Sequence, residues 1–436
     1  MKGYKKLVPI ILCVLVVVSC YMLYDEKMSV LNEYNGYLKD ARKMAEQGVV
    51  VDAFESYIKA AEVNDNIDLN IEIGEMYLNV GDVGAAKSWG EEVVDKFPKE
   101  SKSYEFLLGI YKSINGYEDF FKLYSKAGKR DVINENISKM YNEIRYVYKL
   151  EYDLYEEVGV YCGGLCPVKK FDSQWGYLDE NGKRAIPYKY QKVGAFMEEV
   201  APVIDTDGNI MFIDKSNNKK IDLTTIENVV DITSKVSGMF AAYNGQTWDF
   251  YDYNCKKLFG GYDDVSSMGN QIAAVKKNGY WSIINTKGQP VNETKYTDIL
   301  QDEKGVVYRN GVLFANIGGY YYLINGNGEK VSNEKYEQAC LFNDSTYAAV
   351  KTSKGWTFID STGKQVFKEY FDNARSFSNG LAAVQKNGKW GYINGQGELA
   401  IDYTFVDAQD FNVKGCTFIK TSSSGWQFLK LYSMNY

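Results

Sequence analysis

The sequence predicts an α + β chain of several domains, in which an apolar N-terminal helix and helical hairpins precede an all-β antiparallel repeat array. Three observations predict this fold class. Residues 7–24 form an apolar run, residues 29–150 place apolar side chains at helical spacing, and a pattern of an aromatic residue, a hydrophobic strand and a glycine turn recurs from Trp175 onward. Self-similarity at a fixed period indicates stacked small units. We therefore divide the chain into residues 1–28, 29–150 and 151–436.

The first segment predicts a membrane tether. Residues 1–6 are basic, and the apolar run of about 18 residues that follows would be roughly 27 Å long as a helix, close to a hydrocarbon core of about 30 Å. Basic residues ahead of the run predict that the bulk of the chain lies outside the cytoplasm. Alternatively, residues 17–20 resemble the lipobox of bacterial lipoproteins, in which Cys20 would be acylated. Both interpretations place the protein on the outer side of a membrane.

Residues 29–150 predict helical hairpins. In the clearest copy, residues 66–99, Gly74, Tyr77, Ala86 and Pro98 fall at the spacing of the tetratricopeptide repeat, which this copy resembles. Looser copies lie around residues 41–60 and 107–127, and one further amphipathic helix at 133–147 could cover the end of the stack.

The resemblance implies that the first helix of each hairpin lines a concave groove, which in that family usually holds a peptide or a partner protein. In the clearest copy Asp68, Glu75 and Asn79 would point into it. The alternative is that these polar side chains are merely solvated and the helices serve as a spacer between membrane and C-terminal region.

Residues 151–436 predict about eight three-stranded β-units. Asn-Gly pairs at 244, 278, 310 and 387 each predict a hairpin turn, and a second turn ends in a glycine such as Gly397. Small residues opposite the aromatic predict that each large ring packs between successive units. The recurrent aromatics are Trp175, Trp248, Trp281, Tyr321, Trp356, Trp390 and Trp426. The last residue of the preceding strand recurs about every 36 positions, at 168, 203, 243, 275, 315, 350, 384 and 419.

The repeated unit resembles the WG-repeat family. Residues 389–394 read Lys-Trp-Gly-Tyr-Ile-Asn and residues 175–179 read Trp-Gly-Tyr-Leu-Asp, whereas Ser282, Thr357 and Gln427 replace the glycine in other copies. The family has no common activity, so the resemblance implies a β-repeat array with a binding or scaffolding role. The units could form an open superhelix, or a propeller-like ring if the segment before each meander supplies a fourth strand.

Composition narrows the function. The chain has 436 residues, no histidine and a formal net charge of -7. Lack of histidine excludes serine and cysteine triads that use it and most zinc, iron and copper sites, and the negative charge argues against nucleic acid. We expect no metal, no cofactor and no catalytic activity.

These observations predict a membrane-tethered, extracytoplasmic protein-interaction scaffold of a bacterial cell envelope. One alternative is a cell-wall glycan-binding module, because 37 tyrosines and 21 phenylalanines could expose rings that stack on sugars. A second alternative is a hydrolase with two carboxylates roughly 5–10 Å apart in an acidic cleft.

Overall fold

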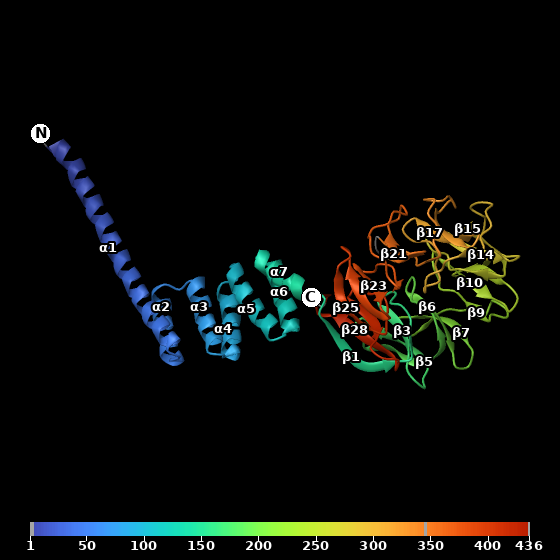
Figure 1. Ribbon diagram of the computed structural model, residues 1–436, viewed down its shortest axis with the longest axis horizontal. Coiled ribbons are helices and arrows are strands. Elements are labelled where there is room, and N and C mark those ends of the chain that lie inside the picture. The colour runs from blue at the N-terminus through green and yellow to red at the C-terminus, as the bar shows by residue number, and fades with distance from the viewer. Residues whose placement is uncertain (1–3, 344–346, 435–436) are drawn as a thin grey trace. The chain divides into compact units, whose positions relative to one another are not determined.

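A computed structural model describes residues 4–343 and 347–434, with side chains from residue 15 onward. The chain divides into two compact units, residues 1–147, with the last two residues, and residues 148–434. The division lies three residues before the predicted start of the β-repeats. Each unit is described by itself below, and Figure 1 labels their elements.

Seven helices build the first unit. They are α1 (Tyr4–Glu46), α2 (Val50–Val63), α3 (Ile67–Asn79), α4 (Val83–Lys96), α5 (Ser101–Ser113), α6 (Tyr117–Lys129) and α7 (Glu135–Ile144). The helices α3, α5 and α7 begin 34 residues apart, which is the period of a tetratricopeptide hairpin. The end of α1 pairs with α2, α3 with α4 and α5 with α6, and α7 follows as the predicted covering helix.

The helix α1 continues across the predicted boundary at residue 28, because neither proline nor glycine lies between residues 10 and 35 to end it. Among the described residues, no helix combines the length and apolar character needed to cross a membrane. Side chains of residues 7–14, which belong to the predicted span, lie outside the described ones.

Local signals set the helix ends and the packing of the hairpins. Asn66 caps α3 and Asp82 caps α4, each side chain accepting a backbone N–H three residues on. A Cβ on Gly74 would lie 2.3 Å from the ring of Phe106, so α5 approaches α3 only because this position is glycine. Phe106 of α5 is therefore the residue for which Gly74 leaves room, as expected for a small residue between packed helices.

The second compact unit, residues 148–434, is called the β-unit below. It contains eight small antiparallel repeats, which we call units 1 to 8 in chain order. Units 1 and 2 share a sheet of β2 (Glu157–Val158), β3 (Leu165–Lys169), β4 (Trp175–Asp179), β5 (Arg184–Val193), β6 (Val200–Asp205), β7 (Ile210–Asp214) and β8 (Lys219–Ile221). Unit 3 consists of β9 (Asp231–Ile232), β10 (Met239–Tyr243), β11 (Trp248–Asp252) and β12 (Lys257–Tyr262).

Units 4 to 6 have three strands each. They are β13 (Asp264–Val265), β14 (Ile272–Lys277) and β15 (Tyr280–Asn285); β16 (Asp298–Ile299), β17 (Val312–Ile317) and β18 (Tyr320–Asn325); and β19 (Gln338–Ala339), β20 (Ala348–Thr352) and β21 (Gly355–Ile359). Unit 7 has β22 (Asn373–Ala374), β23 (Leu381–Lys386), β24 (Lys389–Asn394) and β25 (Leu399–Phe405). Unit 8 has β26 (Asp407–Ala408), β27 (Cys416–Lys420), β28 (Trp426–Leu431) and β1 (Tyr148–Tyr155), with the short helix η1 (Tyr432–Met434) after β28.

The prediction of three strands per unit is therefore too low for several units. Each unit starts with a first strand of about two residues, followed by the predicted hairpin and, where it is fully formed, a fourth strand. The pair Asn310-Gly311 was also misplaced, because it lies ahead of β17 whereas Gly318-Gly319 forms the hairpin turn of unit 5.

An acidic or amide side chain builds the turn after the third strand. The carboxylate of Asp179 accepts backbone N–H groups from Asn181 and Lys183, and Gly182 takes a positive φ of 71°. Equivalent residues make the same two bonds in other units: Asp214, Asp252, Asn285, Asn325, Asp360 and Asn394. The recurrent Asp or Asn is thus explained by turn chemistry.

The glycine after tryptophan lets the fourth strand come close. A Cβ on Gly176 or Gly391 would lie 2.7 Å or 2.6 Å from a carbonyl oxygen of that strand. In unit 3 the glycine is on the partner strand, where Gly260 faces Asp249. Units 4 to 6 lack it on the third strand and pair with their fourth segment through two isolated bridges each; their residues there are Ser282, Tyr322 and Thr357.

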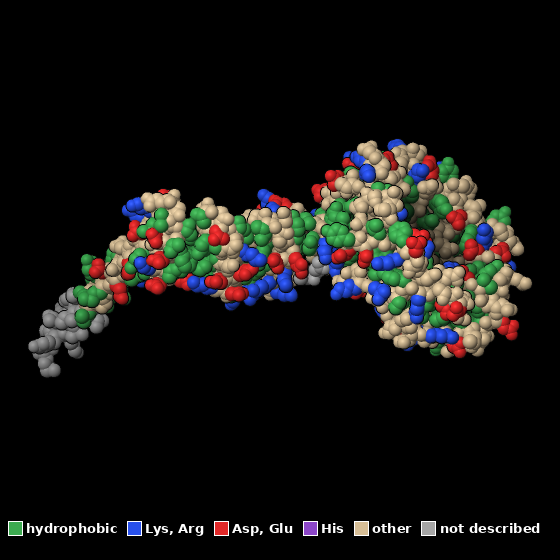
Figure 2. All heavy atoms as spheres, turned by 90° about the horizontal axis from the view of Figure 1, so that it is seen from below, with side chains coloured by type: hydrophobic (Ala, Val, Ile, Leu, Met, Phe, Trp, Pro, Cys, Tyr) green, Lys and Arg blue, Asp and Glu red, His purple; other side chains and the backbone are tan. Residues whose placement is uncertain are grey.

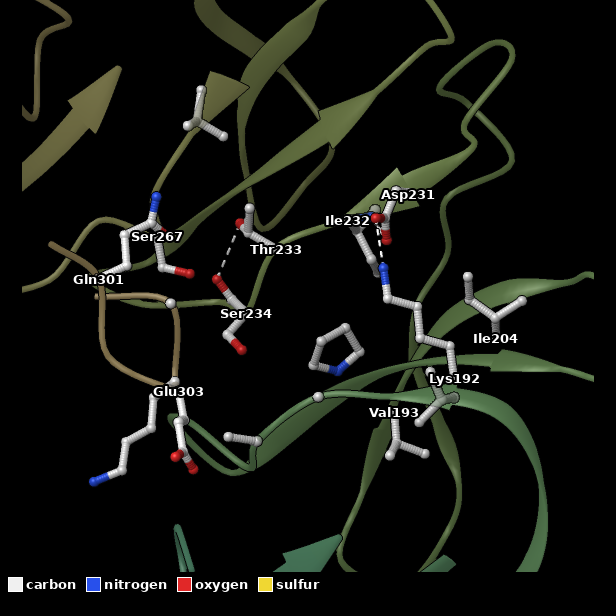
Figure 3. Close-up of a pocket in the computed structure, with 17 residues that line it drawn as sticks. Lys192, Val193, Ile204, Asp231, Ile232, Thr233, Ser234, Ser267, Gln301 and Glu303 are labelled. Carbon is white, nitrogen blue, oxygen red and sulfur yellow. Dashed lines mark hydrogen bonds and ion pairs between the residues drawn. The ribbon is translucent and has the colours of Figure 1, made fainter. Parts of the chain in front are cut away.

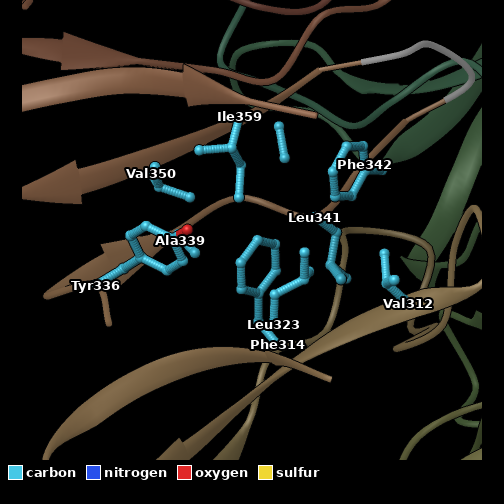
Figure 4. Packing of buried hydrophobic residues seen from close by; sticks show 10 residues of the cluster. Val312, Phe314, Leu323, Tyr336, Ala339, Leu341, Phe342, Val350 and Ile359 are labelled. Atoms are coloured by element: carbon cyan, nitrogen blue, oxygen red, sulfur yellow. The ribbon is translucent and has the colours of Figure 1, made fainter. Parts of the chain in front are cut away.

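Hydrophobic clusters join each unit to the next. In Figure 4, Val312, Phe314 and Leu323 of unit 5 face Val350 and Ile359 of unit 6. The recurrent aromatics Trp281, Trp356, Trp390 and Trp426 are buried, and Trp175, Trp248 and Tyr321 are half-buried. Apart from Trp390, each belongs to or packs against such a cluster.

The array closes on itself. The strand β1 pairs antiparallel with β28, from Tyr148 opposite Leu431 to Tyr155 opposite Trp426. A cluster containing Val168 of unit 1 and Phe428 of unit 8 packs these two units together. The first strand of residues 148–434, β1, is thus hydrogen-bonded to the last strand, β28 (Figure 1).

Candidate functional site

Two surfaces gather polar and charged side chains: a groove on the helical unit and a set of cavities in the β-unit. The groove is a cavity of about 1270 Å³ along α3, α5 and α7. Asp68 and Glu75 line it as predicted, whereas Asn79, the last residue of α3, does not. Leu78, Phe106 and Met140 supply half-buried apolar surface between the charged side chains.

Most charges of the groove are already compensated. Lys102 binds Asp68 at 2.6 Å, and Lys112 binds Glu143. Glu105 accepts hydrogen bonds only from neutral amides, those of Asn134 at 2.9 Å and Asn136 at 2.7 Å. The exposed Glu75 has neither a hydrogen bond nor an ion pair among the described residues. Two carboxylates, Glu75 and Glu105, therefore line the groove without an ion pair among the described residues, as does one lysine, Lys139.

The helical surface is otherwise mixed in charge. Figure 2 shows acidic and basic side chains interleaved over the helical repeats, beside a band of hydrophobic side chains. Among the residues that line the groove, five are acidic and three are lysines. Because Arg42 neutralises Glu72 from outside this lining, the groove carries a net negative charge of one.

A partly exposed ion pair joins the first two hairpins beside the groove. Arg42 of α1 binds both carboxylate oxygens of Glu72, at 2.6 Å and 2.8 Å, and the hydroxyl of Tyr57 donates to the same carboxylate at 2.8 Å. Burial raises the pKa of Glu72, but the hydrogen bonds from Arg42 and Tyr57 outweigh burial and hold it below the usual 4.5.

We expect Glu72→Gln to destabilise the helical unit by about 1 kcal/mol at neutral pH, since it removes a charge-assisted hydrogen bond that is partly screened by solvent. Because the folded pKa is lowered, this contribution is present above the unfolded pKa and lost as pH falls through the folded one. Urea unfolding of both proteins at pH 7 and below pH 4 measures the difference. An unchanged difference at acid pH would contradict the assignment.

Within residues 148–434, we term the loop between the first and second strand of each numbered unit its first connection. The first connections lie near a common centre. Three cavities there, A, B and C, have volumes of about 270, 200 and 270 Å³. Cavity A is lined by units 2 to 5, cavity B by units 1 and 5 to 8, and cavity C mainly by units 1 and 8. We call this region the hub.

One side of cavity A belongs to the first connection of unit 5. Figure 3 shows Gln301 and Glu303 beside Ser267 on one side and Lys192 with Asp231 on the other. Lys192 and Asp231 form an ion pair at 2.6 Å. Thr233 and Ser234 also line the cavity, together with apolar residues such as Ile232, so its lining is mixed.

The first connection of unit 5 is an insertion. It contains twelve residues, 300–311, whereas those of units 1 to 4 and 7 contain six. Insertions in repeat proteins collect on one face, often the binding face. Lys304, in this insertion, lines all three cavities.

The insertion is held rigidly. The Asp302 carboxylate accepts the backbone N–H groups of Lys304 and Val306 and binds Arg309 at 2.9 Å. The carbonyl of Gly305 accepts the N–H of Ser267 in unit 4 at 2.7 Å. In the same loop, Glu303, next to Asp302, binds Arg375 of unit 7 at 3.3 Å. The loop is therefore fixed to units on both sides of the hub.

The walls of cavity B contain unsatisfied polar atoms. Asp410 accepts a hydrogen bond from Asn343 through Oδ2 at 2.9 Å, but its buried Oδ1 has no partner among the described residues. The buried Nε of Arg375 is likewise unpaired within the described part of the chain. Burial raises the pKa of the Asp410 carboxyl, and Arg375 opposes that shift without reversing it.

The donor set of the hub does not suit a metal. Within residues 15–343 and 347–434, no three carboxylate, thiol or imidazole groups converge on one point. The sequence analysis did not identify Lys304, Arg375 or Asp410. The copies at 275 and 315 are 40 residues apart, but so are those at 203 and 243, where the first connection has six residues, so the spacing alone did not mark the insertion.

Four segments match the family described as WG containing repeat: residues 175–208, 261–281, 356–390 and 390–422. No curated protein matches the chain. The helical unit is similar to the Sgt2 TPR domain from Aspergillus fumigatus, with 15% identity, a TM-score of 0.21, and coverage of 25% of this chain and 74% of that one.

Two other solved structures are similar to the β-unit. A eukaryotic initiation factor has 12% identity, a TM-score of 0.42, and coverage of 65% of this chain and 87% of that one. PorZ, a bacterial surface component of the type-IX secretion system of Porphyromonas gingivalis, has 10% identity and a TM-score of 0.35; the match covers 66% of this chain and 38% of PorZ. All three TM-scores lie below 0.5, so the assignment depends on the repeat match and the 34-residue helical period. The β-unit contains WG repeats in these four segments, and the helical unit before it resembles a tetratricopeptide domain.

Proposed function

We propose that this protein is an interaction scaffold whose helical groove holds a segment of a partner protein. The observation that carries the proposal is the groove itself, in which half-buried apolar side chains lie next to two uncompensated carboxylates. An apolar surface flanked by like charges favours a segment that presents apolar and basic side chains. The partner segment is therefore apolar and cationic.

The tether completes the proposed role. The basic residues 1–6 and the apolar run at 7–24 support attachment to the outer side of a membrane, either by an uncleaved helix or through acylated Cys20. The scaffold then presents its groove and its β-repeats outside the cytoplasm of a bacterial cell.

The alternatives have less support. No aromatic side chain lines cavity A or B, and of the two that line cavity C, Phe411 is buried and Tyr161 is half-buried and stacked on Phe418. None of the three cavities therefore offers an open ring for a sugar to stack on. Cavity B does contain three carboxylates, but Arg309 binds Asp302 and Arg375 binds Glu303. Two carboxylates held by arginines are poorly placed to act as a hydrolytic pair.

Site-specific photocrosslinking in intact cells tests the groove. A photoreactive residue at Leu78, inside the groove, is expected to give discrete protein adducts, whereas one at Glu92 on α4 is the matched position outside it. Reversing both uncompensated charges, with Glu75→Lys and Glu105→Lys, should reduce adduct yield at least tenfold because basic partner residues are repelled. Glu92→Lys is the control for added positive charge. Equal adducts from both positions would contradict the proposal.

A further inference from the structure

The hub contains three charged side chains that have no ion pair among the described residues: Lys304, Asp410 and Glu180. Arg375 and Glu303 form an ion pair, whereas Asp410 and Glu180 are each hydrogen-bonded to a neutral amide. Of the two carboxylates, Asp410 has the buried oxygen without a partner. Cavities B and C both reach Lys304 and Asp410. A partly buried carboxylate with an unsatisfied oxygen is costly unless a donor reaches it.

The position of Lys304 depends on the insertion in unit 5. Only unit 5 has a first connection of twelve residues, twice the six of units 1 to 4. Within it, Asp302 binds Arg309 of the same loop, Glu303 binds Arg375 of unit 7, and the carbonyl of Gly305 accepts the N–H of Ser267 in unit 4. Lys304, between them, is the side chain left free to act. A lysine on a fixed loop and a carboxylate that line the same cavity can bind a molecule with both an anionic and a cationic group.

The cavities limit the size of that molecule. Each has a volume of about 200 or 270 Å³, below the roughly 300 Å³ at which sites for drug-sized ligands begin. The walls also contain neutral hydrogen-bonding side chains, among them Asn343, Ser376 and Ser378. A small polar metabolite fits, and a macromolecule does not.

We propose that the hub binds a free α-amino acid, whose carboxylate contacts Lys304 and whose ammonium group contacts Asp410. This inference is independent of the helical groove. It assigns to the β-repeats the recognition of a small zwitterion, while the groove would hold a protein segment.

Calorimetric titration of the full-length protein with each of the twenty common α-amino acids tests the proposal. At least one is expected to bind more tightly than about 1 mM. Its N-acetyl derivative and its carboxamide, which lack the ammonium or the carboxylate, should each bind at least tenfold more weakly. If no amino acid binds, or if both derivatives bind as well as the parent, the proposal is wrong.

Variants locate the site. Lys304→Met and Asp410→Asn should each lower the affinity at least tenfold, and removal of residues 301–306, which restores the six-residue connection of units 1 to 4, should abolish binding. Lys386→Met, an exposed lysine on β23, is the control for loss of a positive charge. Circular dichroism checks that each variant folds. If Asp410→Asn does not fold, Lys304→Met and the deletion still decide, because unchanged affinity in both would overturn the proposal.

Discussion

Phe428→Ala lowers the free energy of unfolding of the β-unit by about 3–5 kcal/mol, as expected for a large aromatic removed from a core. Phe428 is 2% exposed and lies in the cluster that joins unit 8 to unit 1. Its ring is 5.7 Å from that of Phe418 and covers Gly182 of unit 1, where a Cβ would come within 2.9 Å. The substitution therefore removes contacts across the closure of the array.

Urea unfolding followed by near-ultraviolet circular dichroism measures this effect. Leu399→Ala is the control, because Leu399 is 51% exposed and its loss should change stability by less than about 0.5 kcal/mol. Phe314→Ala, in the cluster between units 5 and 6, compares closure with an ordinary contact between neighbours. Equal stability of Phe428→Ala and the wild type would show that the last unit does not pack on the first.

Gly391→Val is expected to destabilise the β-unit by about 3 kcal/mol, near the upper end of the usual range for overpacking. The added Cβ would lie 2.6 Å from the carbonyl oxygen of Ile401, which cannot retreat without disturbing the pairing of β24 with β25. The glycine is thus required by the approach of two backbones, and its φ is ordinary.

Ser282→Val is the matched control for this prediction. Ser282 occupies the equivalent position in unit 4, where the fourth segment pairs through only two bridges. A β-branched residue suits a strand at that place, so we expect a change below about 1 kcal/mol. Thermal unfolding of the two variants distinguishes them. A similar loss in both would mean that the glycine has no special role in fully paired units.

Features with a local cause could be predicted from the sequence. The helical hairpins follow from apolar spacing and from Gly74, and the eight β-units follow from the Asn-Gly pairs and the recurrent glycine turns. Asp68 and Glu75 could be placed on the groove because their helix face is fixed by the period of the helix.

Features that depend on residues far apart in the sequence could not be predicted. The strand β1 has its partner in β28, so no local pattern distinguishes it from a linker, and the predicted boundary at 151 cut through it. Arg375 and Asp410 belong to consecutive units, but they line a cavity with Lys304 of unit 5 only when the units are arranged around the hub. Their contact with the insertion depends on the order of units around the hub, which one sequence does not encode locally.

Closure by β1 has a consequence for biosynthesis. The strand emerges from the ribosome about 280 residues before its partner β28, and at 5–20 residues per second it waits roughly 15–60 s without hydrogen bonds along that edge. An unpaired strand edge is a site of misassociation. Nascent chains of this protein therefore depend on chaperones or translocation partners to shield that edge until the final residues have been synthesised.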